Sequence, residues 1–481
     1  MHAFHFCEWS RWEDAQGQFK EVHNPSTRID AFDDPGTERR VTLLEMPRIW
    51  CTVVLAMLVV VLGLSAGCTG RDYVPNRDIV VLKLTPDCSL EWTRVIDDGF
   101  DDAALDLIEI SGGGYAIAAQ NSSSRFGPSR PVLIRLSQDG AIDGGRFVTD
   151  GLDVARAVIA TGDGGTAVLT GNGTVVRFDP EGRMLWERAT GIPEAYMLLS
   201  TSDGGCLVGG RIMYQVPVND TAGVGTVLPA PVRTTETGLS SGGPILAEAA
   251  DPSIHPTLLE VPRRFTMVRM AMVMKLAPDG AIDWERQYDD HGLTSVESLT
   301  EGPEDAGFLL AGEGTLPNDS FSTPLLVLRL DPEGTPGQVI QFGEATSFPW
   351  SVRMKSDPRG YRILYQPIRI SQENYYRSVV DVVLDRDGRE LEHRTIDASI
   401  AVTWTENGGY FSVGIPPGED RTGYDVSCGL NGRCSFHARV FDSQGMLVLD
   451  RVLPTTTFSE VTKVVQTVDG GYAILALRQN E

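Results

Sequence analysis

The chain has 481 residues, of which 42% are hydrophobic and 51 are glycine, and its formal net charge at pH 7 is −24. The acidity argues against nucleic acid or an anionic lipid surface as the partner. A phosphate backbone needs clustered positive charge, and no run of Lys and Arg exceeds two residues.

The N-terminal part differs from the rest. Residues 1–45 are polar and aperiodic, and we expect either a disordered extension or translation that begins at Met46. No charge occurs from 49 to 70, and the apolar core, Val53 to Leu64, has the length of a signal-peptide core and is short for a membrane span. The sequence therefore predicts an N-terminal hydrophobic helix that directs the chain to the membrane.

The stretch "LSAGC" at 64–68 follows this core. Small residues directly before a cysteine resemble the lipobox of bacterial and archaeal lipoproteins, although Ser65 stands where that motif usually has an aliphatic residue. The resemblance implies that 46–68 is a lipoprotein signal, that Cys68 is lipidated and that 69–78 is a linker. The protein would then be lipid-anchored in the cell membrane and face the exterior or periplasm. An uncleaved signal anchor and a buried helix are the alternatives.

Two motifs alternate from residue 79 to the end of the chain. The first is a strand, a Pro/Asp/Glu-Gly turn and a second strand, with copies that begin at Val80, Val132, Val175, Met272, Leu326, Asp381 and Ala438. The second is an alternating apolar run, a Gly-rich turn and a short aliphatic strand, with copies that begin at Leu105, Ala155, Met197, Val296, Ser351, Ala401 and Val461. Alternation with a period of two, bounded by Gly, Asp and Asn turns, predicts strands throughout.

Two hairpins per unit, repeated at roughly 40 to 55 residues, are typical of a four-stranded propeller blade. The repeats begin with the first motif and finish with the second, so each end of the region holds half a blade. The sequence therefore predicts an all-β fold over 79–481: a seven-bladed β-propeller of four-stranded antiparallel blades, closed by pairing of the N- and C-terminal half-blades.

This pattern resembles the Gly-Gly-Tyr propeller repeats of exported prokaryotic proteins, which are similar to quinoprotein-like (PQQ-like) and YVTN-type propellers. By that resemblance the second motif supplies the inner two strands of each blade and the first supplies the outer two. The chain also resembles the lipoprotein propeller of the outer-membrane assembly machinery, a scaffold that engages partners through exposed loops. Propellers host enzymes, binders and scaffolds alike, so the resemblance implies a fold and leaves function open.

One long insertion interrupts the repeats. We predict an inserted loop at 212–271, rich in Pro, Thr, Gly and Ala, and shorter insertions at 120–130 and 416–435 fall at the equivalent junction. All three should project from the same face of the ring. A protein or glycan partner is expected to bind at this face.

The cysteines of the exported region fall into two groups. Cys88 takes the place of a turn glycine, which predicts a turn of another type, and Cys206 replaces an aromatic residue and is expected to be a buried core thiol. Cys428 and Cys434 enclose a short Gly/Asn loop that could close as a disulfide in an oxidising exterior; two free thiols are the alternative.

Residues with catalytic or metal-binding patterns are scarce. The histidines of the exported part show no metal-ligand spacing. The acidic residues Asp97, Asp98, Asp101 and Asp102 could hold Ca²⁺ through carboxylate oxygens, and a hydrated acidic link is the alternative. No other cofactor is expected.

Tryptophan recurs at one position of the first motif, as Trp92, Trp186 and Trp284. At a repeat position an aromatic residue packs between blades more often than it stacks on a sugar or a quinone, so we expect packing.

The sequence as a whole predicts a monomeric, non-catalytic binding or protein-interaction platform. The alternative is an exported enzyme, a quinoprotein-like dehydrogenase or a glycan-active hydrolase or lyase. That alternative requires polar or charged side chains from several blades to converge on the central channel, whereas apolar and small residues there favour the platform.

Overall fold

The first and last hairpins of the repeat region lie in the same sheet. In the computed structural model, strand β1 (Asn76–Leu84) pairs antiparallel with β28 (Tyr472–Asn480) from Asn76 opposite Asn480 to Leu84 opposite Tyr472. With β2 (Leu90–Ile96) and β27 (Glu460–Gln466) they form the order β2-β1-β28-β27, which we call the joint sheet. The two ends of the repeat region are therefore neighbours, as the half-blade pattern predicts.

The structure describes residues 76–97, 102–122, 129–149, 151, 153–217, 265–288, 291–303, 307–314, 324–342, 348–368, 378–396, 401–415, 435–454 and 458–480. The other strands are β3 (Ala103–Glu109), β4 (Tyr115–Ser122), β5 (Ser129–Leu136), β6 (Ile142–Phe147), β7 (Ala155–Ala160), β8 (Thr166–Thr170), β9 (Thr174–Phe178), β10 (Met184–Ala189), β11 (Glu194–Ser200), β12 (Cys206–Pro217), β13 (Phe265–Leu276), β14 (Ile282–Gln287), β15 (Ser298–Glu301), β16 (Phe308–Glu313), β17 (Leu325–Leu330), β18 (Pro336–Phe342), β19 (Phe348–Asp357), β20 (Gly360–Ile368), β21 (Val379–Asp385), β22 (Glu390–Ile396), β23 (Ala401–Trp404), β24 (Tyr410–Gly414), β25 (His437–Phe441) and β26 (Leu447–Val452).

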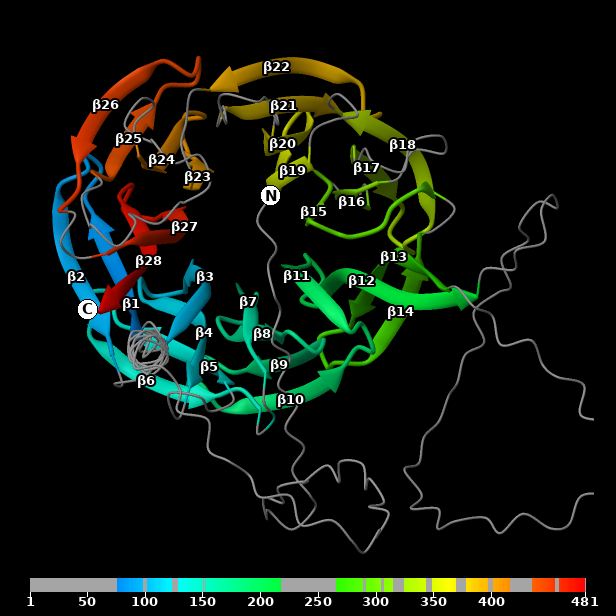
Figure 1. Ribbon diagram of the computed structural model, residues 1–481, viewed down its shortest axis with the longest axis horizontal. Helices are drawn as coiled ribbons and strands as arrows, with labels where there is room; N and C mark the ends of the chain where they lie inside the picture. Colours follow the sequence, from blue (N-terminus) through cyan, green and yellow to red (C-terminus); the bar gives the residue numbers. More distant parts are fainter. Residues whose placement is uncertain are drawn as a thin grey trace, which may run out of the picture. The chain divides into compact units, whose positions relative to one another are not determined.

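These strands form six further antiparallel sheets of four strands, each in chain order, such as β3-β4-β5-β6. The seven sheets stand around a common axis, with β3, β7, β11, β15, β19, β23 and β27 innermost (Figure 1). The second motif therefore supplies the inner strands of each blade and the first motif supplies the outer ones. The prediction of a seven-bladed propeller with four-stranded antiparallel blades is confirmed.

The hydrophobic core is divided among the junctions between neighbouring sheets, which we call seams. Seven clusters of buried residues occupy the seven seams, one each. The joint sheet buries Val80 and Ile474 toward the preceding blade and Val81 and Leu475 toward the following one. Because both faces of every sheet are covered, central strands such as β8 and β24 are buried at every position.

The Gly-Gly turns of the inner hairpins are held by an aspartate. Asp203 accepts hydrogen bonds from Thr201 Oγ1 at 2.6 Å and from the Gly205 amide at 3.0 Å, and buried Lys275 donates to it at 2.5 Å. A Cβ on Gly205 would lie 2.3 Å from the carbonyl oxygen of Leu276, so only glycine fits there. The Asp-Gly-Gly pattern thus joins the inner hairpin to the third strand.

Cys88 forms the same turn as the glycines it replaces, so the prediction of another turn type is wrong. Its φ is 60°, against 78° for Gly140, and its amide donates to the Thr85 carbonyl at 2.9 Å just as the Gly140 amide donates to Ser137 at 2.9 Å. The cysteine accepts a left-handed conformation that L residues rarely adopt. Burial of its side chain in the core offsets that cost.

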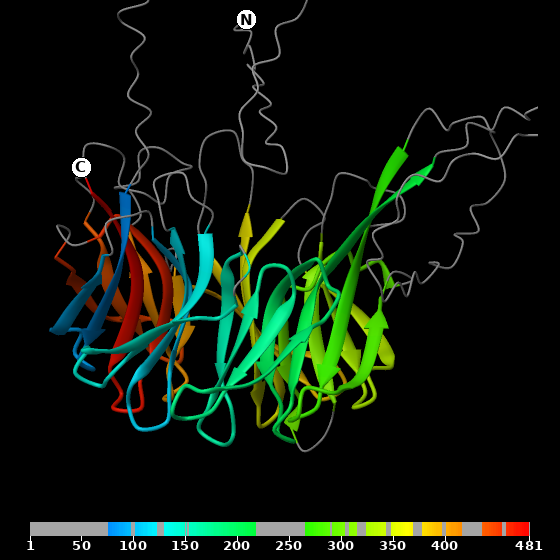
Figure 2. The same cartoon turned by 90° about the horizontal axis from the view of Figure 1, so that it is seen from below.

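Strands β12 and β13 continue into the range predicted as the inserted loop. They pair from Cys206 opposite Leu276 to Pro217 opposite Phe265, which leaves 218–264 as the connection. Their distal part, 212–217 and 265–270, projects beyond the other blades at one end of the ring (Figure 2). We call this part the ribbon.

The ribbon marks the face where the second and third strands of each blade are connected. Strands β4, β12 and β24 end at this face, and β5, β13, β25 and β1 begin there. We call it the loop face, and the opposite end, which carries the hairpin turns, the turn face. The strand ends that border the three predicted insertions therefore lie at one face, while most residues of the insertions lie outside the described part of the chain.

Candidate functional site

Charged side chains from three innermost strands meet inside the ring. Lys463 on β27 forms an ion pair with Asp106 on β3, which is 8% exposed. Arg353 on β19 donates from Nη1 to the carbonyl oxygen of Val464 on β27 at 3.4 Å, and so reaches past the intervening blade β23–β26. We call Asp106, Arg353 and Lys463 the axial cluster. Sequence reasoning did not identify it.

Each strand of the axial cluster carries a β-bulge at the cluster. The register shifts between Ala104 and Asp106, between Trp350 and Arg353, and between Val461 and Lys463. A bulge adds one residue to a strand and turns the following side chains to a new direction. The charged residues therefore depart from the simple alternation of their strands.

Asp106 is fully engaged in contacts between strands. Its carboxylate accepts the amide of Leu107 at 3.0 Å and the amide of Val158 on β7 at 3.0 Å, in addition to Lys463. Burial lowers the pKa of Arg353, and the charge of Asp106 acts in the opposite direction. Polar groups do converge on the centre, but they bind one another and brace β27, β3 and β7, which fits a structural role better than that of a general base.

A second cluster fixes the base of the ribbon. The guanidinium groups of Arg156 and Arg211 each lie over the Tyr196 ring, at 5.5 and 5.6 Å from its centroid. Its hydroxyl donates to Glu194, which also accepts Arg211 Nε at 2.5 Å. Hydrogen bonds from Tyr196 and Arg211 lower the pKa of Glu194, while burial and the bond to Glu194 raise the pKa of Tyr196. The start of the ribbon is thereby tied to β11 and β7.

The ribbon presents one exposed face. Met213 is 38% exposed and Met267 is 51% exposed, and Gln215 and Arg269 lie on the same face in register with them. Residues of the other face, such as Met270, are half-buried or buried. Exposed methionine is flexible and polarisable, and it suits surfaces that pack against other proteins.

The recurring tryptophans connect neighbouring blades at the turn face. Trp284 donates from Nε1 to the Pro332 carbonyl of the next blade at 3.0 Å, and its ring lies against Phe308 with centroids 6.2 Å apart. It also covers Gly334, where a Cβ would lie 2.7 Å from the ring. The same hydrogen bond runs from Trp92 to Gln138 at 3.2 Å and from Trp186 to Pro278 at 2.9 Å.

The acidic residues predicted as Ca²⁺ ligands are described only in part. Asp97 is exposed after β2, and Asp102 is 3% exposed before β3, with its amide donating to the Arg77 carbonyl at 2.8 Å. Asp98 and Asp101 lie outside the described residues. Within the described ranges, no group of three or more His, Cys, Asp or Glu could hold a metal ion. Ca²⁺ binding stays a prediction.

Other predicted residues lie outside the described part of the chain. These are Cys68 with the whole signal segment 46–68, and Cys428 with Cys434. In the ranges that the structure does describe, no helix is long and apolar enough to cross a membrane. Cys206, which is described, is 3% exposed and lies in the core, as predicted.

Comparisons with known proteins find likeness only among solved structures. No protein-family model and no curated protein sequence matches the chain. BamB from Moraxella catarrhalis is 12% identical with a TM-score of 0.35, over 82% of this chain and 91% of that chain. The Dos1 propeller is 10% identical with a TM-score of 0.35 over 78% and 92%, and Sqt1 from Saccharomyces cerevisiae is 10% identical with a TM-score of 0.38 over 76% and 75%. Likeness at this level carries no argument about function.

Proposed function

We propose that the protein is a membrane-anchored, extracytoplasmic propeller that acts as a non-catalytic platform for a protein partner, bound at the loop face. The observation that carries the proposal is the ribbon, which projects from the ring and exposes Met213 and Met267. A rigid scaffold that displays projecting segments on one face is a common arrangement for binding. The anchor rests on the lipobox resemblance at Cys68.

The exposed side chains of the ribbon favour a protein partner over a glycan. Sugars bind to exposed aromatic faces, whereas the three recurring tryptophans are used in contacts with the next blade. The ribbon instead offers methionine beside Arg269 and Gln215, a mixture suited to an interface with an apolar centre and a polar rim. The exported-enzyme alternative gains no support from the axial cluster, because its carboxylate is bound by Lys463 and two backbone amides.

The anchor and the platform are tested separately. Mass spectrometry of the mature N-terminus should find diacylglyceryl-modified Cys68; an intact residue 1 would contradict the lipoprotein assignment. For the platform, the ribbon variant Met213→Ser/Met267→Ser should lose the proteins that co-purify with the wild type from the native membrane. Met446→Ser is the matched control, because Met446 is 67% exposed at the turn face. Equal co-purification by both variants would overturn the ribbon as the binding surface.

A further inference from the structure

The two strands of the ribbon extend beyond their other neighbours in the sheet. Strand β11 pairs with β12 no further than Arg211, and β14 pairs with β13 no further than Met272. Beyond these points the two strands pair only with each other, as far as Pro217 opposite Phe265 (Figure 2). Among the described residues, no third strand pairs with the ribbon at either edge.

The hydrogen bonds of Ala271 show which backbone groups of β13 point away from β12. The amide of Ala271 donates to the Leu293 carbonyl at 3.2 Å, and its carbonyl accepts the Tyr288 amide at 3.0 Å. The direction of backbone groups alternates along a strand with a period of two, and the pairing of β12 with β13 contains no bulge. The amides and carbonyls of Arg269 and Met267 therefore point to the same side as those of Ala271. Within the described part of the chain, nothing bonds to them.

The β12 edge of the ribbon is blocked at its distal end. Opposed residues of an antiparallel pair orient their backbone groups alike, so those of Met213, Gln215 and Pro217 point away from β13. Proline has no N–H, and natural sheets use it to prevent pairing at an edge. Phe265, opposite Pro217 on β13, keeps its N–H. The β13 edge thus offers an N–H at every outward position, and the β12 edge lacks one.

The side chains at the β13 edge determine the chemistry of a complementary strand. Met267 and Arg269 lie two residues apart on the exposed face, and Arg269 is the only charged residue of the ribbon. It forms no ion pair with a described residue. A second copy of this chain, with its net charge of −24, would be repelled, whereas a carboxylate opposite Arg269 would be attracted. The complementary strand therefore carries an acidic residue and, two positions away, an apolar residue opposite Met267.

We propose that the partner protein binds by adding an extended segment of this acidic and apolar pattern as a strand to the β13 edge of the ribbon. Hydrogen bonds to the backbones of Met267 and Arg269 hold the segment, and its alternating side chains provide the specificity. The added strand satisfies amides and carbonyls that the ribbon leaves open. This inference rests on the proposed function and specifies how the partner binds at the loop face.

The test is fluorescence anisotropy of the full chain with a labelled peptide, acetyl-Thr-Glu-Thr-Val-Thr-Val-Thr-amide. In an antiparallel strand this peptide places glutamate opposite Arg269 and valine opposite Met267, and saturable binding is expected. Met267→Pro should weaken binding about tenfold or more, because proline removes an outward N–H and leaves the hydrogen bonds between β12 and β13 intact. Gln215→Pro is the matched control, since it makes the same change directly opposite on the β12 edge, and it should change binding less than about twofold.

Two further measurements separate the N–H from the side chain and from misfolding of a variant. Met267→Ser keeps the N–H and should weaken binding less than Met267→Pro does. The same peptide with both valines N-methylated keeps its side chains but cannot donate to the edge, and it should not bind the wild type. Absence of saturable binding by the unmodified peptide would overturn strand addition, as would equal weakening by Met267→Pro and Gln215→Pro.

Failure of this inference differs from failure of the platform. Loss of co-purifying proteins in Met213→Ser/Met267→Ser, without binding of the peptide to the wild type, would refute strand addition and retain the ribbon as the binding surface. Unchanged co-purification in that variant would refute the ribbon itself as the binding surface for the partner.

Discussion

Leu475→Ala tests whether the terminal hairpins close the ring in solution. Leu475 on β28 lies directly opposite Val81 on β1, although the two residues come from opposite ends of the repeat region. Both are fully buried and both belong to the cluster between the joint sheet and the blade β3–β6. If β1 and β28 are packed neighbours, substitutions at these positions must affect each other.

The expected magnitudes follow from this burial. Leu475→Ala in a fully buried site should cost about 2–5 kcal/mol of unfolding free energy. Val81→Ala removes two methyl groups, worth about 1.6 kcal/mol by transfer alone and somewhat more with the cavity. The double variant should differ from the sum by at least about 0.5 kcal/mol, because the side chains are in contact. Val468→Ala, at 84% exposure in the neighbouring turn, should change stability by less than about 0.5 kcal/mol.

Guanidinium unfolding followed by tryptophan fluorescence measures these differences from the midpoint and the slope. Trp92 lies on β2 in the joint sheet and reports on this region. Strictly additive effects of Leu475→Ala and Val81→Ala would refute the pairing of the ends. So would a Leu475→Ala variant as stable as Val468→Ala.

Asp203→Asn should lower the unfolding midpoint at neutral pH, by an amount that shrinks as the pH falls from about 4 to about 2. Burial alone would raise the pKa of Asp203, but hydrogen bonds from Lys275 and the turn outweigh it and lower the pKa from 3.8 to about 2. The stabilisation is therefore lost as the carboxylate is protonated. A difference in midpoint between wild type and variant that stays constant with pH would contradict this. Cys88 and Cys206 should react with a thiol reagent only after unfolding, because burial raises the pKa of each thiol to about 12; rapid labelling of the native protein would be the contrary result. Trp186→Phe removes the N–H that bonds to the next blade at an exposed site and should cost about 0.5–1.5 kcal/mol in the same unfolding assay, and an unchanged midpoint would show that the contact is not formed.

The fold was predictable because its signals are local. Each hairpin is encoded by alternation and by turn residues within a short segment, as in the run that forms β27 and β28. The pairing of β1 with β28 is long-range, but the half-blade at each end of the repeats leaves each hairpin only one partner of the right kind. The number and order of the repeats therefore predict which distant hairpins pair, although no local pattern does so.

The candidate site was harder to predict because it depends on where strands end and where they bulge. The sequence predicts a loop at the ribbon because proline and glycine dominate the segment that follows. The alternation of apolar and polar residues nevertheless continues through Ile212 and Tyr214, and the strand continues with it. The axial cluster joins Asp106, Arg353 and Lys463 from three blades, and bulges displace each from the alternating pattern. Neither the bulges nor the meeting of these strands leaves a local signal in the sequence.

Contacts between each blade and the outer turn of the next blade explain why tryptophan occupies the position of Trp92, Trp186 and Trp284 in only three blades. At six seams the backbone carbonyl at one position of the outer turn accepts a side-chain donor from the preceding blade. The donor and acceptor pairs are Trp92 with Gln138, Arg135 with Pro180, Trp186 with Pro278, Trp284 with Pro332, Arg329 with Arg386, and Arg394 with Ser443.

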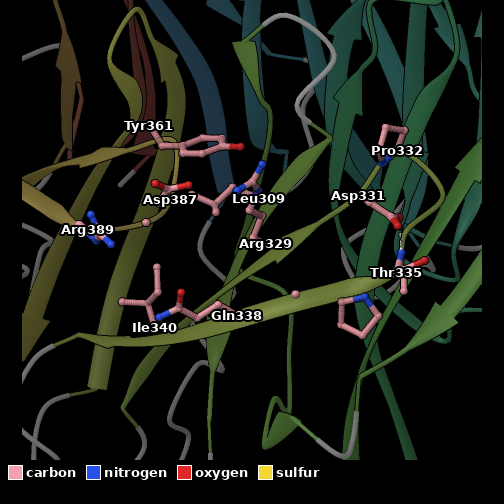
Figure 3. A pocket seen from close by; sticks show the side chains of 13 residues that line it. Leu309, Arg329, Asp331, Pro332, Thr335, Gln338, Ile340, Tyr361, Asp387 and Arg389 are labelled. Atoms are coloured by element: carbon pink, nitrogen blue, oxygen red, sulfur yellow. Dashed lines mark hydrogen bonds between the residues drawn. The ribbon is translucent and has the colours of Figure 1, made fainter.

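The acceptor in these contacts is a backbone carbonyl, which any residue can supply. The contact therefore requires only that the preceding blade carry a side chain that can donate a hydrogen bond. Tryptophan and arginine satisfy the carbonyl equally. The indole of Trp284 also covers Gly334 of the next turn, whereas at the seam of Arg329 the side chain of Ile340 covers the corresponding Gly388. Where Gln338 stands in place of the indole, in the wall of a surface pocket (Figure 3), Arg329 serves as the donor and the seam stays bonded. A propeller of this kind can therefore vary the residue at this position from blade to blade without losing the contacts that hold its ring.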